Sequence, residues 1–325
     1  MNKVKVILDS GAYTAHKKGI NISIDEYAEY VKNHNNEYNG GAFNLDVIGD
    51  AKASYENWKY LINKGVNVIP VYHIGTPEKY LKYYLKETDY IGLGAIADLS
   101  TSKRIPSLDR IWNEYFLTSK GITKVKVHGL GITAFDLMKR YPWYSVDSMT
   151  PVMAAAFGGL FLPKYTNGVF RYDLIFSCKI SDQAKYTIGT TTHFPNLPVF
   201  LQEKYIELFE QNGFKLGDLY YKRKKLKEGE KVKPTLFPNM VKEVISGTEK
   251  TLANDWEERM VWNLFVWNEI KKQHLNKMIL YLGCSTARHA RIFSKFEPRH
   301  DVLVSYAYIN DTYYKDIMKY KNRTK

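Results

Sequence analysis

The chain has 325 residues, 45% of them hydrophobic, and a formal net charge of +13. This length suits one large α/β barrel or two ordinary domains, and the hydrophobic content excludes global disorder. So large a positive charge indicates a polyanionic partner, because clustered lysines and arginines gain affinity by displacing counterions from phosphates. A lysine-rich, solvated surface is the alternative interpretation.

The two cysteines, Cys178 and Cys284, lie far apart in the sequence. They exclude a disulfide framework and a zinc cluster made of cysteines, and they fit a reducing compartment. The first residues lead into a strand that contains Asp9 and do not resemble a signal peptide. No apolar run reaches the roughly eighteen residues that cross a bilayer. We therefore expect a soluble, cytoplasmic protein.

Short apolar runs alternate with amphipathic segments up to about residue 150. The alternation predicts right-handed βαβ crossovers and a parallel sheet. The expected strands cover residues 4–9, 42–45, 67–71, 90–91, 123–127 and 143–146. The expected helices between them cover residues 23–34, 52–63, 76–87, 107–116 and 133–140, with Ser107 and Thr133 as the N-caps of the last two.

Two further βα units are expected near the C-terminus, with strands at 278–282 and 302–309 and helices at 287–296 and 313–320. Eight units favour a TIM-type (β/α)8 barrel, and a six-stranded doubly wound sheet with a helical domain is the alternative. Residues 161–276 do not follow the repeat, so we expect a basic, mostly helical insertion between barrel segments 1–160 and 277–325. Within it we expect a β-hairpin at 169–179, helices at 198–211, 239–250 and 255–274, and a basic tract at 222–227. The last of these helices is so broadly apolar that we expect it to pack on the barrel.

Polar residues follow the six clear strands, at the edge where a parallel barrel places its pocket. In chain order they are Asp9, Asp46, His73, Gly92 to Gly94, His128 and Asp147. Three aspartates that converge on one opening should differ in pKa, which allows them to divide acid, base and nucleophile roles. A divalent metal held by Asp9, Asp46, His73 and Asp147 is an alternative, since His and Asp are ordinary ligands.

Six segments in the same order resemble the tRNA-guanine transglycosylase superfamily, whose members exchange guanine for a 7-deazaguanine on a zinc-bearing barrel. The segments are Asp9-Ser10-Gly11-Ala12-Tyr13-Thr14, Asn44-Leu45-Asp46, Pro70-Val71-Tyr72-His73-Ile74-Gly75, Ile91-Gly92-Leu93-Gly94-Ala95, Val127-His128-Gly129-Leu130-Gly131 and Val146-Asp147-Ser148-Met149-Thr150-Pro151. The resemblance covers roughly residues 1 to 160, about half of the chain.

The resemblance implies a role for each matched position. Asp147 is the expected nucleophile, since a carboxylate can trap the sugar covalently, and Asp9 is the expected general acid/base. Asp46 is expected to read the edge of guanine. His73 stands where the family has glutamine, and His128 where an apolar residue covers one face of the base. The expected substrate-binding residues are Ser10, Tyr13, Asp46, His73, Gly92, Gly94 and His128, with Tyr13 stacking on the base.

The chain departs from the family because it lacks the CxCxxC cluster that binds zinc, so no cofactor is expected. This departure favours the phage and bacterial branch that inserts a 7-deazaguanine of the preQ0 type into DNA. The expected DNA contacts are Lys222, Arg223, Lys224, Lys225 and Lys227. Three alternatives stay open: a tRNA enzyme that has lost zinc, a metal-dependent hydrolase on the same barrel, and an inactive nucleic-acid-binding module.

Overall fold

A computed structural model describes residues 4–96, 99, 101–132, 134–181, 184, 192–217, 221–223, 240–242, 249–275, 277–284, 286, 289, 292–293, 301–309, 315–316 and 318–319. The chain divides into two compact units, one made of residues 1–149 with 275–325 and the other of residues 150–274. Thr133, and most of the helices expected at 287–296 and 313–320, lie outside the described residues.

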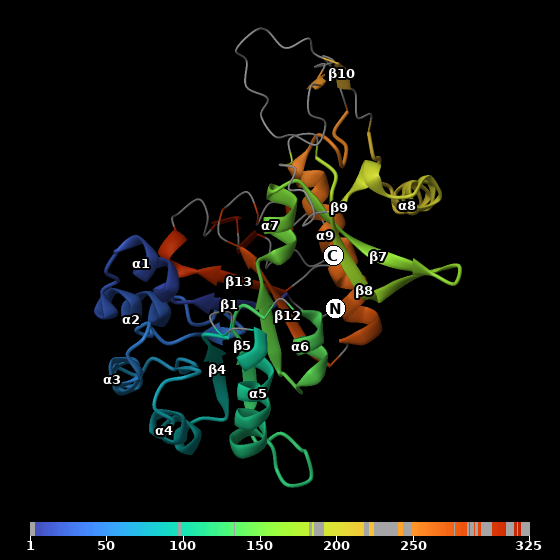
Figure 1. The fold of residues 1–325 in the computed structure, drawn as a ribbon. Coiled ribbons are helices and arrows are strands. Elements are labelled where there is room, and N and C mark those ends of the chain that lie inside the picture. The colour runs from blue at the N-terminus through green and yellow to red at the C-terminus, as the bar shows by residue number, and fades with distance from the viewer. Residues whose placement is uncertain are drawn as a thin grey trace, which may run out of the picture. The chain divides into compact units, whose positions relative to one another are not determined.

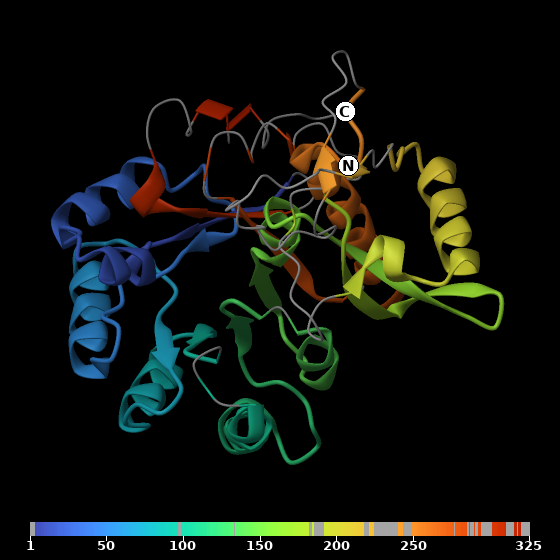
Figure 2. The ribbon, with the colours of Figure 1, turned by 45° about the horizontal axis from the view of Figure 1, so that its top comes forward.

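The first unit is built on a curled, eight-stranded parallel sheet, which Figures 1 and 2 show from two sides. The strands follow one another in the order β2-β1-β13-β12-β6-β5-β4-β3. They are β1 (Val6–Asp9), β2 (Gly41–Ala42), β3 (Val71–His73), β4 (Tyr90–Gly94), β5 (Lys126–Gly129), β6 (Ser145–Ser148), β12 (Ile279–Cys284) and β13 (Asp301–Ser305). The predicted α/β fold with a parallel sheet is thereby confirmed.

The two edge strands of this sheet, β2 and β3, are joined by one parallel bridge. Phe43, next to β2, pairs with Ile69, two residues before β3. The amide of Asn44 donates to the Ile69 carbonyl at 2.8 Å, and the amide of Ile69 donates to the Ala42 carbonyl at 2.8 Å. The third strand was expected to start at residue 67, whereas β3 starts at Val71. The reason is that Pro70 has no N–H to donate and interrupts the ladder of hydrogen bonds.

Helices follow the strands of the first unit, and α2, α3 and α4 pack side by side beside the sheet (Figure 1). They are α1 (Ala12–Lys18), α2 (Ile24–Asn33), α3 (Ala51–Asn63), α4 (Lys79–Glu87), α5 (Thr101–Ile111), a π-helical turn η1 (Trp112–Phe116), α6 (Phe135–Arg140) and a 3₁₀ turn η3 (Tyr306–Tyr308). Ser107 is not an N-cap. The helix begins at Thr101 and continues past Pro106, burying Leu108 and Ile111.

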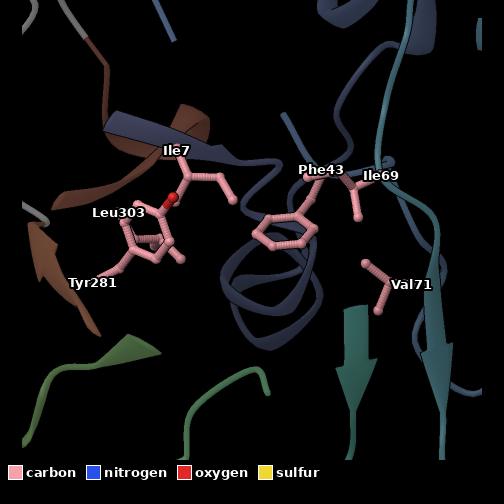
Figure 3. Close-up of a cluster of buried hydrophobic side chains, with 6 residues drawn as sticks. All are labelled: Ile7, Phe43, Ile69, Val71, Tyr281 and Leu303. Atoms are coloured by element: carbon pink, nitrogen blue, oxygen red, sulfur yellow. The ribbon is translucent and has the colours of Figure 1, made fainter. Parts of the chain in front are cut away.

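One part of the core of this unit is a cluster of apolar side chains from β1, β13, β12 and β3 and from the segments next to β2 and β3. Figure 3 shows Phe43 at its centre, with Ile7, Tyr281 and Leu303 on one side and Ile69 and Val71 on the other. Because side chains alternate between the two faces of a strand, the residue two positions after each core residue points the same way. Asp9, two positions after Ile7, and His73, two positions after Val71, therefore lie on the same face of the sheet, one layer above the cluster.

In the part of the second unit that the structure describes there are two small sheets and three helices. They are α7 (Thr150–Ala156), β7 (Gly159–Thr166), β8 (Val169–Lys179), β9 (Thr192–His193), a 3₁₀ turn η2 (Phe194–Asn196), α8 (Val199–Gln211), β10 (Tyr221–Arg223), β11 (Met240–Lys242) and α9 (Trp256–His274). The expected hairpin at 169–179 is instead one long strand that pairs with β7. Residues 240–242, placed in a helix by sequence reasoning, pair with β10 as a strand.

The expected helices at 198–211 and 255–274 are present as α8 and α9. The apolar residues of α9 are used inside its own unit, where it packs on α7 and β7. Asn263 donates to the carbonyl oxygens of Pro151 at 3.0 Å and Gly159 at 3.2 Å, and accepts from the amide of Phe161 at 2.8 Å. These buried bonds tie the helix to the strand that follows α7.

Candidate functional site

Asp9 ends β1, and a tight turn folds the following chain back over its carboxylate. Gly11 adopts φ +77°, a conformation that favours glycine, and a Cβ at this position would lie 2.5 Å from the Cβ of Ala307. The Gly11 amide donates to Asp9 Oδ2 at 3.3 Å, and the Ala12 amide donates to Ser10 Oγ at 3.3 Å. The sequence Ser-Gly-Ala after the strand therefore positions the carboxylate and begins α1.

The pKa of Asp9 is raised to about 7. Burial is the main cause, because it disfavours the charged form, and the negative charges of Asp46 and Asp147 raise the pKa further. The Gly11 amide and the Ser305 hydroxyl lower it in part. Asp9 can therefore hold a proton or release it near neutral pH, as a general acid/base must.

Asp46 and His73 form a hydrogen-bonded pair at the ends of the neighbouring chain segments. His73 Nε2 lies 2.9 Å from Asp46 Oδ2, and the two side chains are 12% and 10% exposed. The hydroxyl of Ser10 lies 3.4 Å from the other oxygen, Asp46 Oδ1. The pair therefore presents a small polar surface that remains accessible to a ligand.

The glycines of β4 leave room for these side chains. A Cβ on Gly94 would lie 2.7 Å from Cδ2 of His73, and a Cβ on Gly92 would lie 3.2 Å from Phe43. The Gly92 amide donates to the Pro70 carbonyl at 2.8 Å and is therefore used within the sheet. The glycines act here by having no side chain.

Gly94→Ala is expected to lower the free energy of unfolding by about 1–3 kcal/mol, since the added methyl group must displace the His73 ring. Chemical denaturation measures the change. In a His73→Ala background the clash is absent, so the same substitution should cost clearly less. Equal costs in the two backgrounds would show that His73 does not set the requirement for glycine.

Asp147 is the third residue of β6 and is held from two sides. His128 Nε2 lies 3.1 Å from Asp147 Oδ1, and the Gly131 amide donates to the same oxygen at 2.8 Å. His128 itself has no exposed surface and lies against the rings of Phe43 and Tyr281, with centroids 4.8 and 6.0 Å away. Sequence reasoning placed His128 on a face of the substrate, whereas the structure places its ring beneath Asp147.

The remaining site predictions concern Tyr13 and the basic tract. Tyr13, the second residue of α1, is 54% exposed, and the Lys17 ammonium lies 5.4 Å from its ring centroid. Its ring is thus accessible for stacking, as expected. In the second unit, Lys222 and Arg223 belong to β10. The other expected DNA contacts, Lys224, Lys225 and Lys227, lie outside the described residues.

Three residues near the site were not expected from the sequence: Ser145, Tyr90 and Ser305. Ser145 precedes Asp147 by two positions on β6, and Tyr90 precedes Gly92 by two positions on β4, so both share the inward face of their strands. Ser305 pairs in register with Asp9. Alternation along β4 and β6 places Tyr90 and Ser145 on the inward face, whereas Ser305 and the hydrogen-bond partners depend on strand order and register.

Within the described ranges, no group of three or more His, Cys, Asp or Glu side chains is arranged to hold a metal ion. The helices of the same ranges include none long and apolar enough to cross a membrane. Comparison with known proteins finds no matching family model, no matching curated protein and no matching solved structure.

Proposed function

We propose that the protein is a base-exchange glycosyltransferase that replaces guanine in DNA by a 7-deazaguanine of the preQ0 type, on a closed (β/α)8 barrel. The observation that carries the proposal is the different surroundings of two carboxylates from two strands. One oxygen of Asp147 accepts two hydrogen bonds, whereas the pKa of the buried Asp9 is raised to about 7. Such a difference supports separate nucleophile and acid/base roles.

In the proposed first step, Asp147 attacks C1′ of the target nucleotide. The C1′–N9 bond breaks, a C1′–O bond to the carboxylate forms, and Asp9 donates its proton to the departing guanine. The covalent intermediate divides one difficult substitution into two easier ones. Neutral guanine leaves, and Asp9 is left ionised.

The second step reverses the first with a different base. The N9–H of the 7-deazaguanine gives its proton to Asp9, N9 bonds to C1′, and the bond to Asp147 breaks. Asp9 ends protonated and Asp147 ends ionised, so the cycle needs no external acid or base. A pKa of about 7 suits a group that must donate a proton in the first step and accept one in the second.

The Asp46–His73 pair is the proposed contact for the polar edge of the base. Asp46 offers carboxylate oxygens to the N1–H and 2-amino donors of guanine, a donor pattern that adenine and cytosine do not present. His73 Nε2 and the Ser10 hydroxyl contact the two oxygens of Asp46 at 2.9 and 3.4 Å and hold the carboxylate in place. The exposed ring of Tyr13 is the proposed stacking surface.

The proposed closure of the barrel is supported by the bridge between Phe43 and Ile69, which pairs the two edges of the sheet. DNA is the proposed polymer because the net charge of +13 favours a polyanion and because two distant cysteines cannot form the zinc cluster of the tRNA enzymes. A duplex target must first be unstacked and flipped out, at a cost of a few kcal/mol.

An exchange assay with labelled guanine tests the proposal. We expect purified protein to incorporate the label into duplex DNA and to release it when an unlabelled 7-deazaguanine is added. Parallel reactions with tRNA distinguish the two polymers. Incorporation into tRNA alone would reassign the substrate, and no incorporation into either would contradict base exchange.

A further inference from the structure

A chain of hydrogen bonds, partly buried at Tyr90 and fully buried at Ser145 and His128, leads from β4 through β6 and β5 to Asp147. The hydroxyl oxygens of Tyr90 and Ser145 are 2.8 Å apart, Ser145 Oγ is 2.8 Å from His128 Nδ1, and His128 Nε2 is 3.1 Å from Asp147 Oδ1. Ser145 and His128 have no exposed surface. Asp147, at the end of the chain, keeps a side chain that is 12% exposed.

The chemistry of the two ends fixes the direction of donation along this chain. A carboxylate can only accept, so His128 Nε2 must carry the hydrogen that faces Asp147. In a neutral imidazole Nδ1 is then an acceptor, which the Ser145 hydroxyl satisfies by donating to it. Tyr90 in turn donates to Ser145, and burial raises its pKa, which keeps the phenol protonated.

The opposite direction leaves a donor without an acceptor. If His128 were an imidazolium, Nδ1 would donate to Ser145, whose hydroxyl would then donate to Tyr90. The phenol hydrogen of Tyr90 would need another acceptor, and the described residues provide none in hydrogen-bond contact with it. Tyr90 is partly buried, and about 1–3 kcal/mol is the upper limit of the cost of leaving its donor unsatisfied.

We infer that Tyr90, Ser145 and His128 form a positioning chain that holds His128 as the neutral Nε2–H tautomer and fixes one oxygen of Asp147. Both bonds to Asp147 from described residues converge on Oδ1, so Oδ2 is the oxygen left for reaction. The tautomer follows from the geometry alone, whereas the catalytic consequence rests on the proposed function. A fixed carboxylate reaches the attacking geometry without paying reorganisation at each turnover.

The tautomer is tested directly by nitrogen NMR of the histidine side chains in the unmodified protein. The protein has 8 histidines. The signal that is missing from the spectrum of the His128→Gln variant is the signal of His128. We expect a neutral ring with its proton on Nε2 near neutral pH. A ring protonated on Nδ1, or on both nitrogens, would overturn the inference whether or not the protein exchanges bases.

The positioning role is tested by Ser145→Ala and Tyr90→Phe, each of which removes one hydroxyl. We expect kcat for base exchange to fall about 10- to 100-fold in Ser145→Ala, with KM changed less than about 2-fold, because the chain does not contact substrate. Ser145→Thr keeps the hydroxyl and should restore most of the rate. The matched control is Tyr144→Phe. The ring of Tyr144 lies 5.2 Å from that of Tyr90, but Tyr144 is not part of the positioning chain, so this variant should leave kcat unchanged.

The outcomes separate the two proposals. A rise in KM with kcat unchanged, or equal loss in Ser145→Ala and Ser145→Thr, would overturn the positioning role. If Ser145→Ala does not fold, Tyr90→Phe and the NMR signal of the unmodified protein still decide the question. Absence of base exchange in the unmodified protein would contradict the proposed function and leave the tautomer to be judged by NMR.

Discussion

Asp147→Asn is expected to lower the rate of base exchange by at least about 10⁴-fold, because the amide cannot form the glycosyl bond that the carboxylate forms. The substitution keeps the volume of the side chain, and the amide oxygen can still accept from His128 and Gly131. The fold should therefore persist. The rate of guanine exchange and the yield of a covalent protein–DNA adduct, measured after denaturation, check the prediction.

Asp136→Asn provides the control, since Asp136 is an exposed residue of α6 and undergoes the same chemical change. It should leave both the rate and the adduct unaffected. An Asp147→Asn variant that retains the adduct would show that another group is the nucleophile. Asp9 and Asp46 would then be the next residues to substitute.

Asp9→Asn is expected to produce two opposite effects. Exchange activity should fall about 10²- to 10⁴-fold, the usual contribution of a positioned acid/base. Stability should rise at alkaline pH, because the pKa of Asp9 moves from 3.8 to about 7 on folding. Each pKa unit corresponds to about 1.4 kcal/mol, so the upper limit of the gain is about 4 kcal/mol.

The pH dependence of that gain follows from proton binding. Between pH 3.8 and about 7 the native state of the unmodified protein binds more protons at Asp9 than the unfolded state does. Its stability therefore decreases as pH rises through this window, and the full penalty applies above it. Denaturation at a series of pH values should show the variant and the unmodified protein converging below about pH 4 and separating towards pH 8.

Asp89→Asn is the matched comparison for stability. Asp89 is exposed and its pKa is lowered, mainly by the hydrogen bond from Lys126, so its substitution should not stabilise the protein at any pH. A constant difference between Asp9→Asn and the unmodified protein across the whole pH range would contradict a raised pKa at Asp9.

Sequence periodicity predicted which residues end the strands, because alternation and β-branched runs are local signals. Asp9, His73, His128 and Asp147 do lie at or near the ends of parallel strands. The pairing of each histidine with an aspartate was not predictable, because it depends on strand order and register. For the same reason, the hydrogen bond between Ser145 and His128, which is on the neighbouring strand, was not predictable.

Local signals also conflicted at several places. Asn167 and Gly168 have φ values of +52° and +82° and make the two-residue turn between β7 and β8, as an Asn-Gly pair favours. The sequence interpretation placed the hairpin after this pair. The sequence interpretation started a helix at Ser107, whereas the helix begins at Thr101, includes Pro106 and buries Leu108 and Ile111.

Nucleoside analysis of DNA from cells that express the protein tests the central claim most directly. The cells should be supplied with a labelled 7-deazaguanine and express either the unmodified protein or Asp147→Asn. We predict a labelled 7-deazaguanine deoxynucleoside in the first DNA, with a matching loss of deoxyguanosine, and none in the second. Unmodified DNA from both cultures, or label found only in tRNA, would contradict exchange of guanine in DNA.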